Sequence, residues 1–230
     1  MWPFPPIQNE RVLLYITTQE ILCAWINSRK DKQLVLKKYL KLPLHTIHPA
    51  AIAKELKPFI SAHNLSHSLL SISLAAPLLH EEFIRLPHAS PVPRDFVMAP
   101  LEKMLWDYRY LHTLDDGYHL FYVCGISLPE LFSYQLLAHA MNLRITTITS
   151  VYASLAQAYR ALYGPAFRRS QMAIDMITNK YQLQNSISTD TIARLLYISP
   201  ELSVDVVQEK VALLSMIGLC YQESEINGIY

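Results

Sequence analysis

No glycine precedes Gly117 in this chain of 230 residues, and only four follow it. Loops that hold nucleotide phosphates need glycines at short, fixed spacings, because backbone N–H groups must approach the phosphates closely and often through positive φ angles. The later glycines, Gly125, Gly164, Gly218 and Gly228, are too widely spaced for such a loop. We therefore expect a fold without phosphate-loop chemistry and without a bound cofactor.

The composition indicates a folded protein with no global charge. Hydrophobic residues make up 51% of the chain and the formal net charge is +1, which gives no overall attraction to nucleic acid or anionic lipid. No apolar run approaches the roughly 20 residues that span a bilayer. The start, Met1-Trp2-Pro3-Phe4-Pro5-Pro6, lacks the charged and apolar regions of a signal peptide, so we expect a cytoplasmic location.

The pattern of apolar residues predicts strands alternating with helices. Residues 12–16, 21–26 and 34–42 are typical of a three-stranded meander, and Pro49 suits the first turn of a helix over 49–63. Further strands are predicted at 69–74, 78–86, 109–113, 119–126 and 144–149, with Asp116-Gly117 marking a hairpin turn. Helices are predicted at 93–108, 129–142, 151–162, 167–181, 189–196 and 204–221. The order implies an α/β layer fold with a helical C-terminal part, ending in a frayed tail at 224–230.

The residues that could carry chemistry are not grouped as catalysis or metal binding requires. The pairs His45/His48 and His63/His67 have no nearby carboxylate to complete a zinc site. Glu81 and Glu82 are strand neighbours, which face opposite sides, and Asp115-Asp116 belongs to a turn. Cys23, Cys124 and Cys220 lie in apolar runs and are expected to be reduced core residues. We expect no catalytic residues and no metal ligands.

Two features of the sequence are also compatible with nucleic-acid or protein partners. The strand with Lys37, Lys38 and Lys41 also carries Tyr39, and aromatic-plus-basic strands can bind single-stranded nucleic acid, although the near-zero net charge favours an ordinary solvated face. A dense aromatic group suits either a protein interface or the packing of a helix against the hairpin. Its members are Trp106, Tyr108, Tyr110, Tyr118, Phe121, Tyr122, Phe132 and Tyr134.

The order of elements resembles the PilM family of type IV pilus assembly proteins, which have the actin-like ATPase fold and are related to the division protein FtsA. Ile84-Arg85-Leu86-Pro87, a loop and then Leu101-Glu102-Lys103-Met104-Leu105-Trp106 are similar to the family's entry into an inserted subdomain, 1C. The helix at 128–142 and Arg144-Ile145-Thr146-Thr147-Ile148-Thr149 look like its second helix and return strand. Val211-Ala212-Leu213-Leu214-Ser215-Met216-Ile217-Gly218-Leu219 is similar to the family's terminal helix.

The resemblance implies an actin-like, RNase H-like, subdomain 1A over residues 11–75 plus 150–230, behind an N-terminal arm at 1–10. An α+β insert resembling 1C would occupy residues 76–149. The family's first phosphate loop carries an Asp-Ile-Gly-type turn, whereas this chain has Tyr15-Ile16-Thr17-Thr18-Gln19-Glu20. Too few residues remain for the second actin-like domain, so we expect it to be largely missing. Val207, Val211, Leu214 and Gly218 are expected to form the inward stripe of the last helix.

The function implied by the resemblance is that of a non-catalytic scaffold of a type IV pilus or type II secretion-like assembly. It would bind the cytoplasmic N-terminal segment of a PilN-like inner-membrane protein, would reach the membrane only through that partner, and could form a homo-oligomer. The alternatives are an actin-like ATP-binding protein and a nucleic-acid-binding module that uses the lysine strand or a winged-helix-like segment at 187–221. The family's peptide site maps to two segments of this chain, namely Leu74, Ala75, Ala76, Pro77 and Leu78, and Ile148, Thr149, Ser150, Val151 and Tyr152.

Overall fold

A computed structural model gives the fold and describes residues 10–28, 33–44, 48–87, 104–163, 188–199, 202 and 209–226. The expected helix at 167–181, residues 1–9 of the expected N-terminal arm at 1–10 and the start of the expected helix at 93–108 lie outside these residues. Within them the chain forms a mixed α/β structure with two sheets and five helices. None of these helices is both long and apolar enough to cross a bilayer.

The larger sheet has six strands in the order β8-β4-β1-β2-β3-β9. The expected meander is confirmed, because β1, β2 and β3 pair antiparallel in sequence order. β4 then lies parallel beside β1, and β8 lies parallel beside β4, so the carboxyl ends of β1, β4 and β8 meet at one edge of the sheet. The bounds of these strands are β1 Glu10–Ile16, β2 Glu20–Ser28, β3 Leu34–Pro43, β4 Leu69–Leu74, β8 Arg144–Ser150 and β9 Leu196–Ile198.

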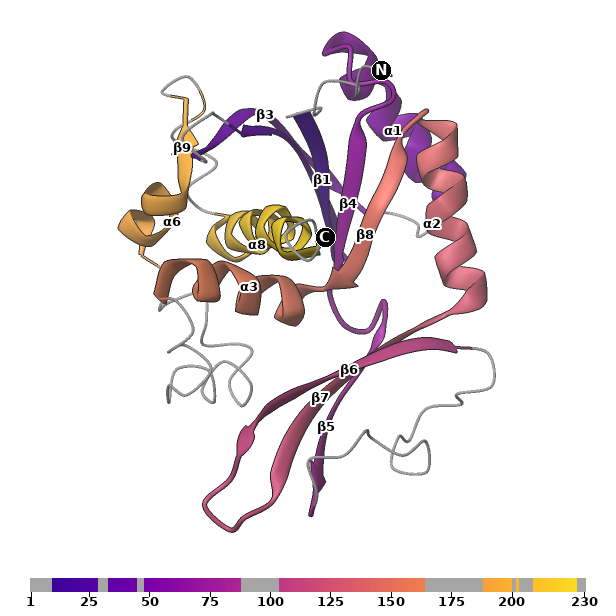
Figure 1. Ribbon diagram of the computed structural model, residues 1–230. Helices are drawn as coiled ribbons and strands as arrows, with labels where there is room; N and C mark the ends of the chain where they lie inside the picture. The colour runs from indigo at the N-terminus through magenta and orange to yellow at the C-terminus, as the bar shows by residue number, and fades with distance from the viewer. Residues whose placement is uncertain are drawn as a thin grey trace, which may run out of the picture.

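Helices cover both faces of this sheet (Figure 1). One face carries α1 (Pro49–Ala62) and α2 (Leu128–Ala140), which pack against each other. The other face carries α3 (Val151–Tyr163), α6 (Thr189–Leu195) and α8 (Lys210–Ile226). The sheet residues alternate between the two cores: Leu13, Leu22 and Ala24 belong to the α8 side, whereas Leu14, Cys23 and Ile72 belong to the α1 side. The strands are thus buried on both faces, which explains their nearly continuous apolar sequences.

Helix α8 fills the space between α3 and the sheet, which curves around it (Figure 1). Nine consecutive residues from Ala212 to Cys220 are buried, so the helix is enclosed on all sides. The expected stripe is confirmed at Leu214 and Gly218 and, with partial exposure, at Val211, but it is not bounded by polar faces. A helix that is apolar all round belongs in a core and not on a surface. Val207 lies outside the described residues.

A serine triad ties α8 to its neighbours. The hydroxyl of Ser73 on β4 lies 3.0 Å from that of Ser154 on α3 and 2.7 Å from that of Ser215 on α8, and the last two are 2.6 Å apart. All three side chains are buried. Each hydroxyl has partners within the triad, so no hydroxyl of this cluster is buried without a hydrogen bond. The cluster thereby links β4, α3 and α8.

The smaller sheet is inserted between β4 and α2 and projects from one end of the larger one (Figure 1). Its order is β5-β7-β6, all antiparallel, with bounds β5 His80–Leu86, β6 Met104–Thr113 and β7 His119–Ser127. The predicted hairpin turn is confirmed, with Gly117 at φ +82°. Ring contacts join Trp106, Tyr108, Tyr110 and Phe121 along one face of this sheet.

The helix predicted over 93–108 is wrong in its described part, because Met104–Thr113 is strand β6. The positions of Leu105 and Tyr108 are compatible with helical spacing, but Trp106, Tyr108 and Tyr110 also alternate with period two. Pairing with β7 decides between the two patterns, since aromatic residues pack well across neighbouring strands. The aromatic residues from Trp106 to Tyr122 therefore belong to the smaller sheet and its hairpin, whereas Phe132 and Tyr134 lie on the helix that begins at Leu128. The expected packing of a helix over 93–108 against the hairpin is corrected.

Three further expectations are corrected near the C-terminus and the insert. β9 is a strand that was not predicted, and it pairs with β3 so that the helix before it ends at Leu195. α8 continues to Ile226, so residues 224–226 are helical where a frayed tail was expected. β8, which the resemblance placed in the insert, hydrogen-bonds to β4 in the larger sheet, and α2 packs on α1. Only β5, β6 and β7 form the separate sheet.

Candidate functional site

The two segments expected to bind a partner are brought together at the carboxyl edge of the larger sheet. Leu74 at the end of β4 pairs with Ile16 on one side and with Ser150 on the other. Ligands of α/β sheets commonly bind where the carboxyl ends of parallel strands meet, because the following loops diverge there. This edge is therefore the candidate binding site of the fold.

Half of the ten expected residues are buried inside the chain and do not face solvent. Leu74 and Ser150 are fully buried, and Thr149 and Tyr152 are nearly so. The accessible part is the turn after β4, where Ala76 and Pro77 are exposed. Ala75, Ile148 and Val151 are half-buried, and Leu78 is 7% exposed. A partner can thus reach the Ala75–Leu78 turn directly, whereas the second segment is buried or half-buried.

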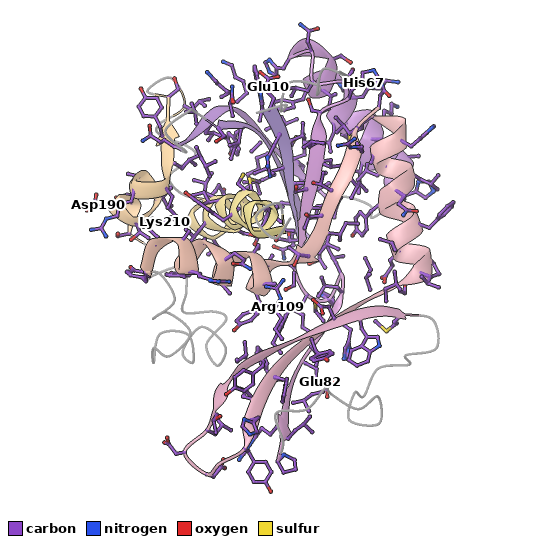
Figure 2. All side chains as sticks on the ribbon, in the orientation of Figure 1. Glu10, His67, Glu82, Arg109, Asp190 and Lys210 are labelled. Atoms are coloured by element: carbon purple, nitrogen blue, oxygen red, sulfur yellow. The ribbon has the colours of Figure 1, made fainter. Side chains whose placement is uncertain are left out.

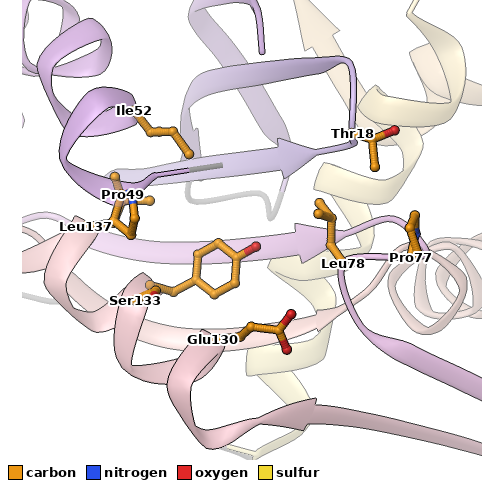
Figure 3. Close-up of a pocket in the computed structure, with 9 residues that line it drawn as sticks. Thr18, Pro49, Ile52, Pro77, Leu78, Glu130, Ser133 and Leu137 are labelled. Atoms are coloured by element: carbon orange, nitrogen blue, oxygen red, sulfur yellow. The ribbon is translucent and has the colours of Figure 1, made fainter. Parts of the chain in front are cut away.

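A pocket of about 190 Å³ opens beside this turn (Figure 3). Pro77 and Leu78 form one wall, and Pro49 and Ile52 at the start of α1 form another. The remaining lining comes from Thr18 in the β1–β2 turn and from one side of α2, namely Glu130, Ser133, Tyr134 and Leu137. The lining is largely apolar with a few polar groups, as in most small binding sites.

Glu130 places a carboxylate at the edge of the pocket. Its Oε2 accepts hydrogen bonds from Ser127 Oγ at 2.7 Å and from the Ser127 N–H at 3.2 Å, and Ser127 Oγ accepts from the Glu130 N–H at 3.3 Å. This capping box begins α2 and holds the carboxylate in place. Burial, and then the charge of Glu130, raises the pKa of Tyr134 to about 12, so its phenol is neutral at physiological pH.

The pocket therefore combines an apolar floor with a negative charge at its edge. Such a site suits a large apolar side chain next to a cationic group. The pocket's walls come from segments far apart in the sequence, and Thr18, Glu130, Ser133 and Tyr134 were not expected as site residues. The Ser127-x-x-Glu130 spacing predicts the start of a helix, but no local feature of the sequence indicates that this helix start lies beside the β1–β2 turn.

The β1–β2 turn corresponds, by the resemblance, to the first phosphate loop. Its backbone N–H groups form hydrogen bonds within the turn itself. Thr17 Oγ1 accepts hydrogen bonds from the N–H groups of Gln19 at 3.1 Å and Glu20 at 3.0 Å. The Thr17 N–H in turn donates to the Glu20 carbonyl at 2.9 Å. A phosphate loop presents such N–H groups outward to the ligand. In this turn the N–H groups of Gln19 and Glu20 already donate to the Thr17 side chain, so they are not free to bind a phosphate.

A second polar cluster joins the smaller sheet to the start of α3. The Tyr122 hydroxyl donates to Glu81 at 2.6 Å and also contacts the Ser150 hydroxyl, while Ser150 Oγ accepts from the Ala153 N–H at 3.0 Å. The Tyr122 and Tyr152 rings lie 4.5 Å apart. Burial raises the pKa of Tyr122 well above its usual range, and Glu81 adds to that effect. Ser150 and Tyr152 thus serve the junction between the two sheets, where Arg109 also lies (Figure 2).

The other candidate residues are engaged in packing or surface pairs. His63 packs against Trp25 and Phe59, and His67 contacts Asn142 at 3.1 Å. The described residues contain no cluster of three potential metal ligands. Glu81 and Glu82 face opposite sides as expected, because Glu81 contacts Tyr122 and Glu82 contacts His80 on the other face. His45 lies outside the description.

The cysteines and lysines have similarly structural surroundings. Cys23 and Cys220 are buried free thiols, as expected, and burial raises the pKa of the half-buried Cys124 to about 11. A thiol with a raised pKa stays protonated and unreactive at neutral pH. Lys41 of the lysine strand pairs with Glu20 at 2.8 Å and with Glu209, which neutralises part of that strand's charge.

Comparison with known proteins identifies the fold of this chain but not its family. No protein-family model matches the sequence, and no curated protein sequence matches it. Among solved structures, a chain of a PilM-PilN type IV pilus biogenesis complex aligns over 95% of this chain and 99% of its own length, with a TM-score of 0.58 and 11% identity. This likeness and the β3-β2-β1-β4-β8 strand order define an actin-like α/β fold.

Two further structures align less closely. The cytoplasmic domain of EpsL, an inner-membrane component of the type II secretion system of Vibrio cholerae, gives a TM-score of 0.44 at 11% identity over 63% of this chain and 58% of its own. A Bacteroides thetaiotaomicron protein of unknown function with an actin-like ATPase fold gives 0.41 at 12% identity, over 70% and 60%. This chain thus spans about three fifths of each of these two chains.

Proposed function

We propose that this protein is a non-catalytic, cytoplasmic scaffold of a type IV pilus or type II secretion-like assembly, held at the inner membrane by a PilN-like partner. The observation that carries the proposal is the fold shared over nearly the full length of both chains with a component of a PilM-PilN complex. In this proposal the larger sheet with its helices corresponds to subdomain 1A, and the projecting sheet of β5, β6 and β7, within residues 76–149, corresponds to 1C.

The pocket beside the Ala75–Leu78 turn is the proposed peptide site. It overlaps the expected partner-binding residues at Pro77 and Leu78. An extended N-terminal segment would bury one large apolar side chain against Ile52 and Leu137, and a neighbouring basic residue would approach Glu130. Such a segment gains affinity from its main chain and specificity from the pocket.

The occupied turn between β1 and β2 supports a scaffold in preference to an ATPase. The N–H groups of Gln19 and Glu20 bind Thr17 Oγ1, and the turn contains no glycine that would let a phosphate approach. In this proposal the fold keeps the architecture of an actin-like ATPase and uses it to hold a protein partner.

The test is a titration with synthetic N-terminal peptides of the membrane proteins encoded beside this one, followed by fluorescence anisotropy. We expect saturable binding that Thr18→Trp weakens at least about tenfold, because a bulky side chain at this exposed position fills the pocket. Gln19→Trp is the matched control, since Gln19 is exposed in the same turn but does not line the pocket. Absence of binding up to about 1 mM, or equal effects of both variants, would refute the proposed site.

A further inference from the structure

The outer face of α2 carries an apolar stripe whose side chains point away from the protein. Leu128, Phe132 and Leu136 are 48%, 59% and 50% exposed. They are spaced by four residues, so they lie one above another along the same side of the helix. The buried side of α2, with Tyr134, Leu137 and Ala138, faces the core. The helix is therefore apolar on two opposite sides, of which the fold uses one.

A surface helix normally presents polar side chains to water, and a continuous exposed apolar stripe marks an interaction site. The stripe is too regular to be scattered exposure. α2 lies on the outside of its layer, where its outer face is turned away from the sheet (Figure 1). A partner can therefore approach along the whole length of the helix.

The charges around the stripe argue against a lipid surface. Residues 128–140 contain no lysine or arginine, and their only acidic residue, Glu130, lines the pocket on another side of the helix. Helices that lie on membranes combine an apolar face with many basic residues. The helix lacks that basic face, so the stripe fits a neutral, apolar protein surface.

The spacing makes the stripe complementary to itself. Phe132 is at its centre with a leucine four residues to each side. If two copies of α2 pair antiparallel about a two-fold axis through Phe132, the two phenylalanines meet, and each Leu128 meets Leu136 of the other copy. A two-fold interface requires this kind of self-complementary surface. Antiparallel pairing also sets the helix dipoles in opposite directions.

We propose that the outer face of α2 is the interface of a homodimer, formed by antiparallel packing of this stripe on its counterpart in a second copy. The stripe lies on the side of α2 away from Tyr134 and Leu137, so dimer formation leaves the pocket accessible. Stable interfaces bury about 800 Å² on each partner, more than three half-exposed side chains supply, so we expect a weak dimer with a dissociation constant between about 1 µM and 1 mM.

The test is sedimentation equilibrium of the full chain over that concentration range. Leu128→Lys combined with Leu136→Lys sets like charges opposite each other and should weaken the dimer at least about tenfold. Leu128→Lys combined with Leu136→Glu is the matched variant, because each new lysine then faces a new glutamate of the other copy. We expect this second variant to dimerise more tightly than the first, and increasingly so at low salt.

An equimolar mixture of the single variants Leu128→Lys and Leu136→Glu should likewise associate more than either variant alone. All these positions are exposed, so circular dichroism and thermal melting should match those of the unmodified chain. A monomeric chain at about 1 mM would overturn the proposal, as would equal association of the two double variants. Binding of the monomer to phosphatidylglycerol vesicles, abolished by Phe132→Glu, would instead identify the stripe as a lipid-docking face.

Discussion

Replacing Gly218 with alanine should destabilise the protein strongly, although alanine is the better helix former. Gly218 lies in α8 where that helix touches α3. A β-carbon built there overlaps the Ser154 carbonyl oxygen and lies 2.6 Å from the carbonyl carbon and 3.2 Å from the Ala158 nitrogen. These are backbone atoms, which cannot turn aside as a flexible side chain would.

The magnitude follows from the overlap. Carbon atoms pack at about 3.5–4.0 Å, so the helices would have to separate by about 1 Å. This separation would loosen the packing of α8 in the core and stretch the hydroxyl contacts of Ser154 and Ser215. Overpacking costs about 1–3 kcal/mol or more, and alanine returns about 1 kcal/mol in helix propensity. Because backbone is obstructed, we expect a net loss of at least about 2 kcal/mol.

Urea unfolding followed by circular dichroism measures this loss. For a slope of about 1–3 kcal/mol per molar urea, the midpoint should fall by about 1 M. Gly125→Ala is the control, since its β-carbon would meet first the mobile Met104 Cε at 3.1 Å. We expect this variant to stay within about 0.5 kcal/mol of the original. If Gly218→Ala unfolds at the same urea concentration as the control, α3 and α8 are not in backbone contact, and the enclosed position of α8 is wrong.

Three other results are expected. Raising the pH from 10 to 12 should lower the free energy of unfolding, because burial, with Glu20 and Glu209, raises the pKa of Tyr15 from 10.0 to about 12; the stability tied to the neutral phenol is lost in that window, and Tyr15→Phe should make the profile measured by urea unfolding less steep, while the other buried tyrosines keep part of the slope. Deleting residues 210–230 should give an aggregated protein on size exclusion, because nine consecutive core residues are removed; a soluble, cooperatively melting product would contradict the architecture. Mg-ATP should leave the melting temperature unchanged in a thermal-shift assay, whereas a ligand at one hundred times its dissociation constant adds about 2.7 kcal/mol.

The sequence predicts most strands, helix starts and turns well where the signals are local. Runs of apolar residues, Pro49 at a helix start and the Asp116-Gly117 turn each act within a few positions, and all three are found where expected. The failures occur where two periods compete or where a partner strand decides. At Met104–Thr113 the aromatic spacing fits helix and strand alike, and only pairing with β7 selects the strand. β9 has three residues and depends wholly on β3.

The resemblance located the carboxyl edge of the larger sheet but not which of its residues are accessible. The adjacency of Leu74 and Ser150 follows from parallel strands, whereas exposure depends on what the inserted sheet covers, and that is a tertiary property. The Tyr122 hydroxyl forms a hydrogen bond with the Ser150 hydroxyl, so replacing Ser150 would disturb the junction between the sheets as well as any bound peptide. Thr18, Pro77 and Ser133 line the pocket from three separate segments and are not in the buried core. Substitutions there would separate the proposed partner binding from folding, which substitutions at the buried Thr149, Ser150 and Tyr152 would not.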